Sequence, residues 1–447
     1  MGQRSMFRRT PLVLALCAGL SLLSAPASAA SLSLIEAYRA ALANDSAYRA
    51  AVYANESGQE NRILGRSNLL PSLSASYSGS KAHSDITYGS KAQPQQDYIS
   101  RSANVQLRQS LFSLDAWARY KQGGLQSDYS SAVFLSEQQQ VIMRTVSAYI
   151  ELLFKEDQLA LAQWERDTYV ERMKANDRLF AQGEGTRTDM LETRARLDVA
   201  EAGLLDAQDN LYSTRLALEA IVGGPVESLD HLTPEFNGRV SEPMSFDAWK
   251  RVALERNPDL KAKLIAVEIN QQEINKARAG HLPRMDLVAT YGKNTSESIN
   301  TINQDSTTRS IGIQLNIPLY SGGAVNASTR QAVANKEKAL ADLQAEKDKQ
   351  LLELRKNFDS LTSSAARIDA LMKAVESGRL LVKATEQSIK GGIRINLELL
   401  DAQRQLSSTQ RDLAQARYTY VLAHFKLRAA AGTLGENDVR EISAYFR

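Results

Sequence analysis

The chain of 447 residues carries 54 Lys and Arg residues against 51 Asp and Glu residues, with one Cys and four His residues. The excess of three positive charges equals the number of arginines within residues 1–29, so the rest of the chain is neutral overall. A nucleic-acid-binding protein needs a basic surface, and this balance argues against that class. Beyond Cys17 the chain has no cysteine, which excludes disulfides, thiol catalysis and thiolate metal sites there.

Residues 1–29 have the pattern of a secretory signal peptide. A basic start precedes an apolar stretch at residues 11–23 and an Ala-Ser-Ala cleavage site at residues 27–29. Cys17 follows Leu16, where a lipoprotein signal needs a small residue, so we expect no lipid anchor. No later stretch approaches the ~20 apolar residues of a membrane helix. The sequence therefore predicts an exported protein without membrane helices.

Two long proline-free segments, residues 115–182 and 324–390, are dominated by helix-forming residues. At ~1.5 Å per residue, a helix over either segment would be about 100 Å long. A compact domain cannot bury helices of this length, so the segments predict coiled coils or an extended bundle.

The sequence repeats itself at a distance of about 210 residues. Residues 185–187 resemble residues 392–394, and from Met190 the two copies stay in step until Gly223 and Gly432. This period is too long for a solenoid and predicts a duplicated domain. We expect a first repeat at 30–223, a linker at 224–245, a second repeat at 246–432 and a tail at 433–447.

The last helix of each repeat carries heptads, which predict a coiled-coil seam. A Gly-containing turn precedes each of these helices, so we expect each to pack antiparallel to the long helix before it. The large seam residues recur every seven positions: Met190, Leu197, Leu204, Leu211 and Leu218 in the first repeat, and Leu399, Leu406, Leu413, Tyr420 and Leu427 in the second.

Four short segments alternate apolar and polar residues, at about 72–80, 101–112, 284–293 and 309–320. Period-two alternation over ~10 residues is typical of a transmembrane β-strand, although a soluble hairpin with one buried face shows it too. Two symmetric hairpins on an exported chain with over-long helices favour the membrane interpretation. The polar stretches 81–98 and 293–308 would join the strands, as mobile loops or as an extracellular rim.

Four strands in a membrane cannot stand alone, because open sheet edges are not tolerated in lipid and a barrel needs at least ~8 strands. Two copies would supply eight strands, whose interior side chains fill, whereas three would supply twelve and leave an open channel. The long helices would continue the wall of this tube on the periplasmic side.

Three motifs resemble those of the TolC-like outer-membrane efflux and secretion ducts: residues 392–403, residues 185–192 and the Asn-Pro-Asp-Leu sequence at 257–260. The resemblance implies a mainly α fold with a small transmembrane β part. It also implies a homotrimer in the cell outer membrane, with four strands per chain forming one 12-stranded barrel. The helices would form a periplasmic tunnel, and the linker and tail an equatorial belt.

The resemblance further implies a passage without an enzymatic step or cofactor. Its partners would be outer-membrane lipid, a periplasmic adaptor and an inner-membrane ABC transporter, or alternatively a proton-driven efflux pump. The start of the first repeat, residues 33–38 and 44–46, is similar to ducts that export alkaline proteases. This favours type I secretion over small-molecule efflux. A soluble periplasmic scaffold and an enzyme are the other classes considered, and no catalytic or metal-ligand cluster supports the latter.

The resemblance also places a periplasmic constriction on one set of polar residues: Glu398, Asp401, Arg394, Thr188 and Asp189. Glu398 and Asp401 are three residues apart and would share a helix face, so three copies around one axis would form a ring of carboxylates that attracts cations. The alternative is that both acids are ordinary solvated surface charges. Ile389 occupies the position of a family Tyr that bonds to the neighbouring coil, so the closed state needs other contacts.

Overall fold

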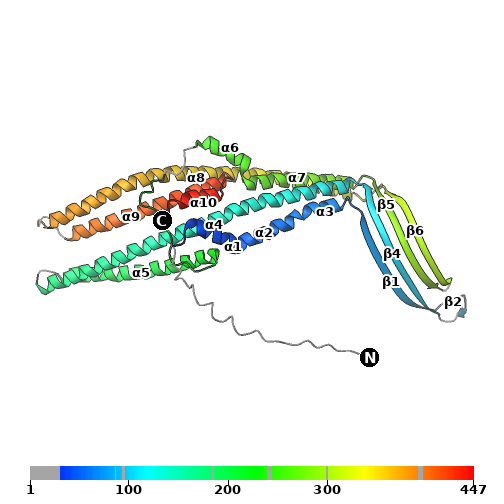
Figure 1. The fold of residues 1–447 in the computed structure, drawn as a ribbon, viewed down its shortest axis with the longest axis horizontal. Coiled ribbons are helices and arrows are strands. Elements are labelled where there is room, and N and C mark those ends of the chain that lie inside the picture. Colours follow the sequence, from blue (N-terminus) through cyan, green and yellow to red (C-terminus); the bar gives the residue numbers. More distant parts are fainter. Residues whose placement is uncertain are drawn as a thin grey trace, which may run out of the picture.

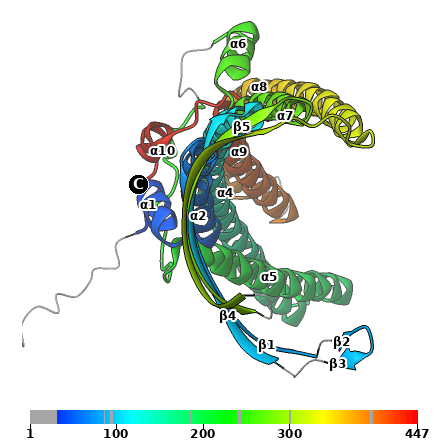
Figure 2. The same cartoon turned by 90° about the vertical axis from the view of Figure 1, so that its right-hand side faces the viewer.

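The computed structural model describes residues 31–85, 87–92, 96–183, 186–238, 244–298, 301–390 and 396–447. The predicted signal peptide lies outside these ranges. Two long helical hairpins extend to one side of a four-stranded sheet (Figure 1), and sheet and helices follow a common arc (Figure 2). The molecule is therefore a curved wall. No helix in the described part of the chain is both long and apolar enough to cross a bilayer.

Helices α4 (Leu114–Ala181) and α5 (Arg187–Val222) form one hairpin, and α8 (Ala324–Lys390) and α9 (Asn396–Ala430) form the other. The two long helices agree with the predicted bounds to within one residue. Ser113 caps α4, its Oγ accepting a hydrogen bond from the backbone N of Ala116 at 3.1 Å. Of the ten predicted seam residues, Leu218, Leu413, Tyr420 and Leu427 are buried in the single chain, and the other six are partly buried.

Shorter helices extend each hairpin toward the sheet or flank it. Helices α2 and α3 pack on α4 in the first repeat, and α7 packs on α4 and α8 in the second. In Figure 2, α1, α6 and α10 lie on the convex side of the wall. The bounds are α1 (Leu34–Asn44), α2 (Ser46–Gln59), α3 (Asn61–Ser67), α6 (Phe246–Arg256), α7 (Pro258–Ala279) and α10 (Glu436–Ser443).

The sheet has the order β1-β4-β5-β6, and all neighbours are antiparallel. Its strands are β1 (Ser72–Ser84), β4 (Gln96–Phe112), β5 (Arg284–Ser298) and β6 (Thr301–Asn316). The pairing of β4 with β5 joins the two repeats in one sheet. A small separate hairpin of β2 (Thr87–Tyr88) and β3 (Lys91–Ala92) lies at the far end.

The prediction of polar loops at 81–98 and 293–308 is wrong over most of both stretches. All four long strands continue into them, and β5 and β6 are separated by residues 299 and 300 alone. The hydropathy pattern missed these extensions because both faces are polar there, whereas the backbone hydrogen-bond ladder does not depend on side-chain polarity. β6 ends at Asn316, short of the predicted residue 320, in keeping with Pro318, which lacks the N–H that a ladder needs.

The largest hydrophobic core lies midway along the helices, where the linker and the tail pack together against them. Tyr149 of α4 donates its hydroxyl to the carbonyl oxygens of Leu32 and Asp230, at 2.8 and 3.0 Å. Phe446 packs edge-on against the Tyr149 ring, and Phe236 contacts Tyr420 in the same way. These contacts hold the start, the linker and the end of the described chain on α4 and α9.

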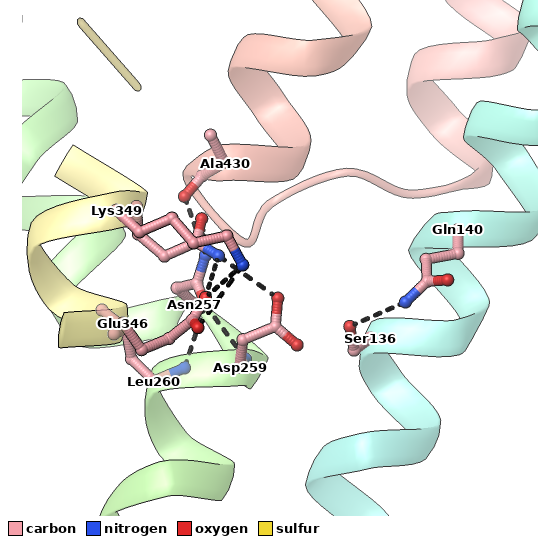
Figure 3. Close-up of polar contacts among 9 residues, drawn as sticks. Ser136, Gln140, Asn257, Asp259, Leu260, Glu346, Lys349 and Ala430 are labelled. Carbon is pink, nitrogen blue, oxygen red and sulfur yellow. Dashed lines mark hydrogen bonds and ion pairs between the residues drawn. The ribbon is translucent and has the colours of Figure 1, made fainter. Parts of the chain in front are cut away.

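One asparagine in each repeat binds the helix end that precedes the glycine with positive φ. Asn257 donates from Nδ2 to the carbonyl oxygen of Ala430 at 2.9 Å, and its Oδ1 accepts from the backbone N atoms of Asp259 and Leu260 (Figure 3). In the first repeat, Asn44 donates to the carbonyl of Val222 at 2.7 Å. The duplication therefore preserves a specific polar contact as well as the order of elements.

Candidate functional site

The described residues of the predicted constriction lie at the end of the molecule farthest from the sheet, where α5 and α9 begin (Figure 1). Glu398 and Asp401 occupy the first turns of α9, three residues apart, and both are exposed. Thr188 is exposed in the first turn of α5. Asp189 lies beside it in the helix, but its side chain is outside the described set, as is that of Ile389 at the end of α8. Arg394 lies wholly outside the described residues.

A favourable helix-dipole interaction offers a structural reason for an acid such as Glu398 in the first turn of α9. Exposure and spacing also suit a cluster of carboxylates around an axis. One chain by itself does not distinguish these roles, because the cluster requires other copies.

A recess beside Asp401 holds basic groups that the sequence analysis did not connect with it. The recess is lined by Arg172 of α4, Arg196 of α5 and Arg404 of α9, together with Trp164 and Tyr169 of α4. Asp401 therefore lies near guanidinium groups from three helices of the same chain. This places the acid at the contact between the two hairpins as well as at their tip.

Two side-chain pairs connect the hairpins further from the tip. Tyr418 of α9 donates its hydroxyl to Oδ2 of Asp157 on α4 at 2.8 Å. Nearer the tip, Arg404 Nε lies 3.7 Å from Glu165 Oε1. The first pair is the better shielded, because Tyr418 is buried and Phe154 packs edge-on against its ring.

The acids on α4 beside this contact are electrostatically unusual. Burial is the largest influence on Asp157 and raises its pKa, although the Tyr418 hydroxyl acts in the opposite direction. Burial likewise raises the pKa of Glu156, which lies 3.6 Å from both Arg215 and His231. A half-buried carboxyl group that keeps a hydrogen-bond donor is suited to holding two helices in one arrangement.

The sequence analysis missed the pairing of Tyr418 with Asp157 because the residues are 261 positions apart and belong to different repeats. One signal was present. Tyr418 and Phe425 are seven residues apart on α9, outside the heptad seam, and both are buried. Two large aromatic residues on a second helix face indicate a second packing partner.

The sheet exposes its apolar face. Leu73, Tyr77 and Ile311 are each more than 70% exposed. On the central strand β4, Ala103 and Val105 are exposed, whereas the alternating polar residues on the other face are partly shielded. This arrangement is the inverse of a soluble hairpin, which buries its apolar face, and it is what a strand with apolar residues toward lipid shows.

The opposite, polar face contains a buried charge cluster near the helices. Asp286 of β5 is 3% exposed and lies between Arg108 of β4, at 2.5 Å, and Arg284, at 3.3 Å. Both arginines are partly exposed, and the two guanidinium groups share one carboxylate, so the cluster has one positive charge in excess. A charged face opposite the apolar one is consistent with a water-filled passage.

An exposed apolar strand face, a polar inner face and a long curved helical wall together define the architecture of a channel-forming outer-membrane protein. A family model described as outer membrane efflux protein matches residues 37–224 and 249–433. The chain belongs to this family, and it is an outer-membrane protein with a long periplasmic extension.

Similar sequences and structures agree with this assignment. The chain is 40% identical over 420 residues to the alkaline protease secretion protein AprF of Pseudomonas aeruginosa, covering 93% of this chain and 87% of that protein. It is 36% identical to the proteases secretion protein PrtF of Dickeya chrysanthemi, covering 94% and 92%. The CmeC outer membrane channel of Campylobacter jejuni has the same fold, with a TM-score of 0.77 at 18% identity, covering 93% of this chain and 90% of that one.

Proposed function

We propose that this protein is the outer-membrane exit duct of a type I secretion system, which passes an exoprotein such as a protease to the outside. The observation that supports this cargo is the near full-length similarity to two protease secretion proteins. Identity to Escherichia coli TolC is lower, at 27%, and identity to the solvent efflux protein SrpC of Pseudomonas putida is 24% over 63% of this chain. Small-molecule efflux is the second candidate.

We propose a homotrimer as the working assembly. β1 and β6 each have an unpaired edge in the single chain, and lipid does not tolerate open sheet edges. Three copies would pair these edges in a 12-stranded barrel, wide enough for a passage. A soluble scaffold does not account for the exposed apolar strand face.

The proposed partners are a periplasmic adaptor and an inner-membrane ABC transporter, which would supply the energy that a passive duct lacks. The duct would need neither a cofactor nor a catalytic step. A proton-driven pump would take the place of the transporter if the cargo were small molecules.

We further propose that Glu398 and Asp401 line the narrowest part of the periplasmic end, with Arg394, Thr188 and Asp189 nearby. The exposure of both acids and their place at the start of α9 support this role. Three copies would bring six carboxylates to one neck, where their field would favour cations.

The test of the cargo compares a deletion strain with its parent and with the complemented strain. We expect one or a few exoproteins to disappear from the culture medium while tolerance to toxic small compounds is unchanged. Loss of tolerance with the exoproteins intact would reject secretion and establish efflux as the function.

A further inference from the structure

The outward face of the sheet changes character at the same place on every strand. Moving away from the helices, the continuous run of apolar residues on this face ends at Tyr77, Ala103, Tyr291 and Ile311, and the next charged residue is a cation in each case. We call these four cations the basic row: Lys81 on β1, Arg101 on β4, Lys293 on β5 and Arg309 on β6. One further apolar residue, Ile99, lies beyond the cation of β4.

The strand register makes the basic row continuous. Arg101 of β4 pairs with Gly79 of β1, and Lys81 lies two residues beyond Gly79 on the same strand. Ala103 pairs with Lys293, and Tyr291 pairs with Arg309. Each cation is thus the diagonal neighbour of the next, at about 7–8 Å between backbones. Like charges at such spacing repel each other unless an anion lies between them.

The basic row is exposed and open to an external anion. All four side chains are exposed, and none forms an ion pair with another described residue. Acids also lie at this edge: Asp305 accepts from Thr295 Oγ1 at 2.7 Å, and Asp97 and Asp85 lie 3.0 and 3.7 Å from the His83 ring nitrogens. Asp97 also interacts electrostatically with Lys81, although the two do not form an ion pair. The Arg309 guanidinium lies 5.6 Å from the centre of the Tyr291 ring, which keeps it against the sheet.

The end of the apolar band nearest the helices has a different composition. Exposed aromatic and aliphatic side chains border it there, including Phe112, Trp117 and Tyr320, and the Trp117 ring lies 5.4 Å from that of Tyr120. Tyr77 and Tyr291 place aromatic rings at the other end too, so the two ends differ in the line of four cations that only the far end carries among the described strand residues. Such an asymmetric band matches a membrane whose two leaflets carry different head groups.

We propose that the basic row binds the phosphate groups of a phosphorylated glycolipid in the outer leaflet of the outer membrane. The inference rests on the proposed orientation, with the helices in the periplasm, and names the lipid class that this surface recognises. Guanidinium groups bind phosphate through paired hydrogen bonds, and the long Lys and Arg stems cover apolar surface while their charges reach the head-group layer. Phosphates bridging diagonal neighbours would relieve the repulsion within the row.

The experiment measures lipid binding to the full-length protein purified as its native oligomer in detergent. The probe is purified lipopolysaccharide with a short saccharide chain, used intact and after enzymatic removal of its phosphates. The variant replaces the row by glutamine (K81Q, R101Q, K293Q and R309Q together). A matched variant removes four exposed lysines of α8 instead (K338Q, K356Q, K373Q and K383Q).

We expect wild type and the α8 variant to bind intact lipid equally, and the basic-row variant to lose about a hundredfold or more in affinity, since it lacks all four cations that attract the phosphates. Wild type should bind the dephosphorylated lipid as weakly as the basic-row variant binds intact lipid. Equal binding of both lipids, or full binding by the basic-row variant, would overturn the proposal. Displacement of the lipid by millimolar inorganic phosphate would instead identify a small-anion site and would also overturn it. This assay measures lipid binding and not export. A negative result in the secretion test would therefore reject the proposed cargo without deciding whether the basic row binds lipid.

Discussion

Asn257 shows how one buried side chain can hold a helix start and a helix end together. Its Oδ1 accepts two backbone N–H groups at the start of α7, while its Nδ2 donates to Ala430 at the end of α9 and to Gln350 of α8. Gly432 has a φ of +71°, and a Cβ there would lie 2.5 Å from the Asn257 Cα. The residue types at both positions are therefore restricted. Position 432 needs a glycine, and its close approach to Asn257 brings the Asn257 side chain within hydrogen-bond distance of Ala430.

Replacing Asn257 by Ala should lower the free energy of unfolding by about 2–4 kcal/mol, because a cap and a buried hydrogen bond are both lost. Asn257→Asp should be destabilising too, since it keeps the cap acceptor but turns a carboxylate oxygen toward the Ala430 carbonyl. The measurement is loss of helical circular dichroism on heating. Asn275→Ala, at an exposed site on the same helix, is the control. An Asn257→Asp variant as stable as wild type would show that the donor to Ala430 is unimportant.

His424 of α9 is buried beside Arg428, and burial, followed by the Arg428 charge, lowers its pKa from 6.5 to about 4. Between these pH values the unfolded chain takes up a proton that the folded chain does not. The free energy of unfolding is therefore unaffected by this group above pH 6.5. It falls by about 3 kcal/mol as the pH drops from 6.5 to 4. His424→Leu should therefore flatten stability against pH in this window, measured by thermal unfolding. His281→Leu, at an exposed position, is the matched histidine control, and an equal slope in both variants would contradict the assignment.

At the scale of elements, each hairpin is packed along its length, and toward the tips the two hairpins contact each other over a smaller area. The seams between α4 and α5 and between α8 and α9 run along whole helices, whereas α4 meets α9 over a shorter stretch, through the shared core and, toward the tips, through side-chain pairs. The contact between the hairpins is therefore where their relative position can change at the lowest free-energy cost.

Tyr418→Phe removes one hydroxyl and leaves the half-buried Asp157 without its donor. The distance between the hairpins should then become less well defined. With cysteine confined to Cys17, in the predicted signal peptide, spin labels can be placed at Arg178→Cys and Lys383→Cys, both exposed near the tips. Pulsed electron spin resonance on diluted label should show a broader distance distribution in Tyr418→Phe. Tyr212→Phe, at an exposed tyrosine of α5, is the control, and identical distributions in all samples would argue against this contact as a restraint.

For the whole molecule, the curvature of the wall makes the single chain one part of a tube (Figure 2). Residues that are exposed here at the tip, such as Glu398 and Asp401, would face an axis once three copies assemble. Their effect on transport is therefore a property of the assembly.

Replacing Glu398 and Asp401 together by Ala should raise single-channel conductance in planar bilayers and weaken block by multivalent cations, because the carboxylate ring at the neck would be gone. The matched control is the double Ala variant of Asp206 and Asp209, an exposed pair of acids with the same spacing on α5. Conductance and block that match wild type in the neck variant would refute the constriction. Equal changes in both variants would attribute the effect to net charge alone.

The sequence by itself determined the features that depend on local periodicity. Helix lengths, heptad seams, the duplication and the outward apolar face of the strands follow from spacing along the chain, since backbone hydrogen bonds and side-chain direction repeat every 3.6 or 2 residues. The family motifs then placed the chain in the outer membrane.

The tertiary structure decided which distant side chains meet. Tyr418 and Asp157 are paired across 261 residues, and the four cations of the basic row form a line because β4 and β5, from different repeats, pair in one register. No local period encodes such contacts, because they arise when burial of the seams and completion of the sheet bring separate segments into one fixed arrangement. The strand extensions through polar sequence have the same origin, since the ladder continues wherever a neighbouring backbone is already in place.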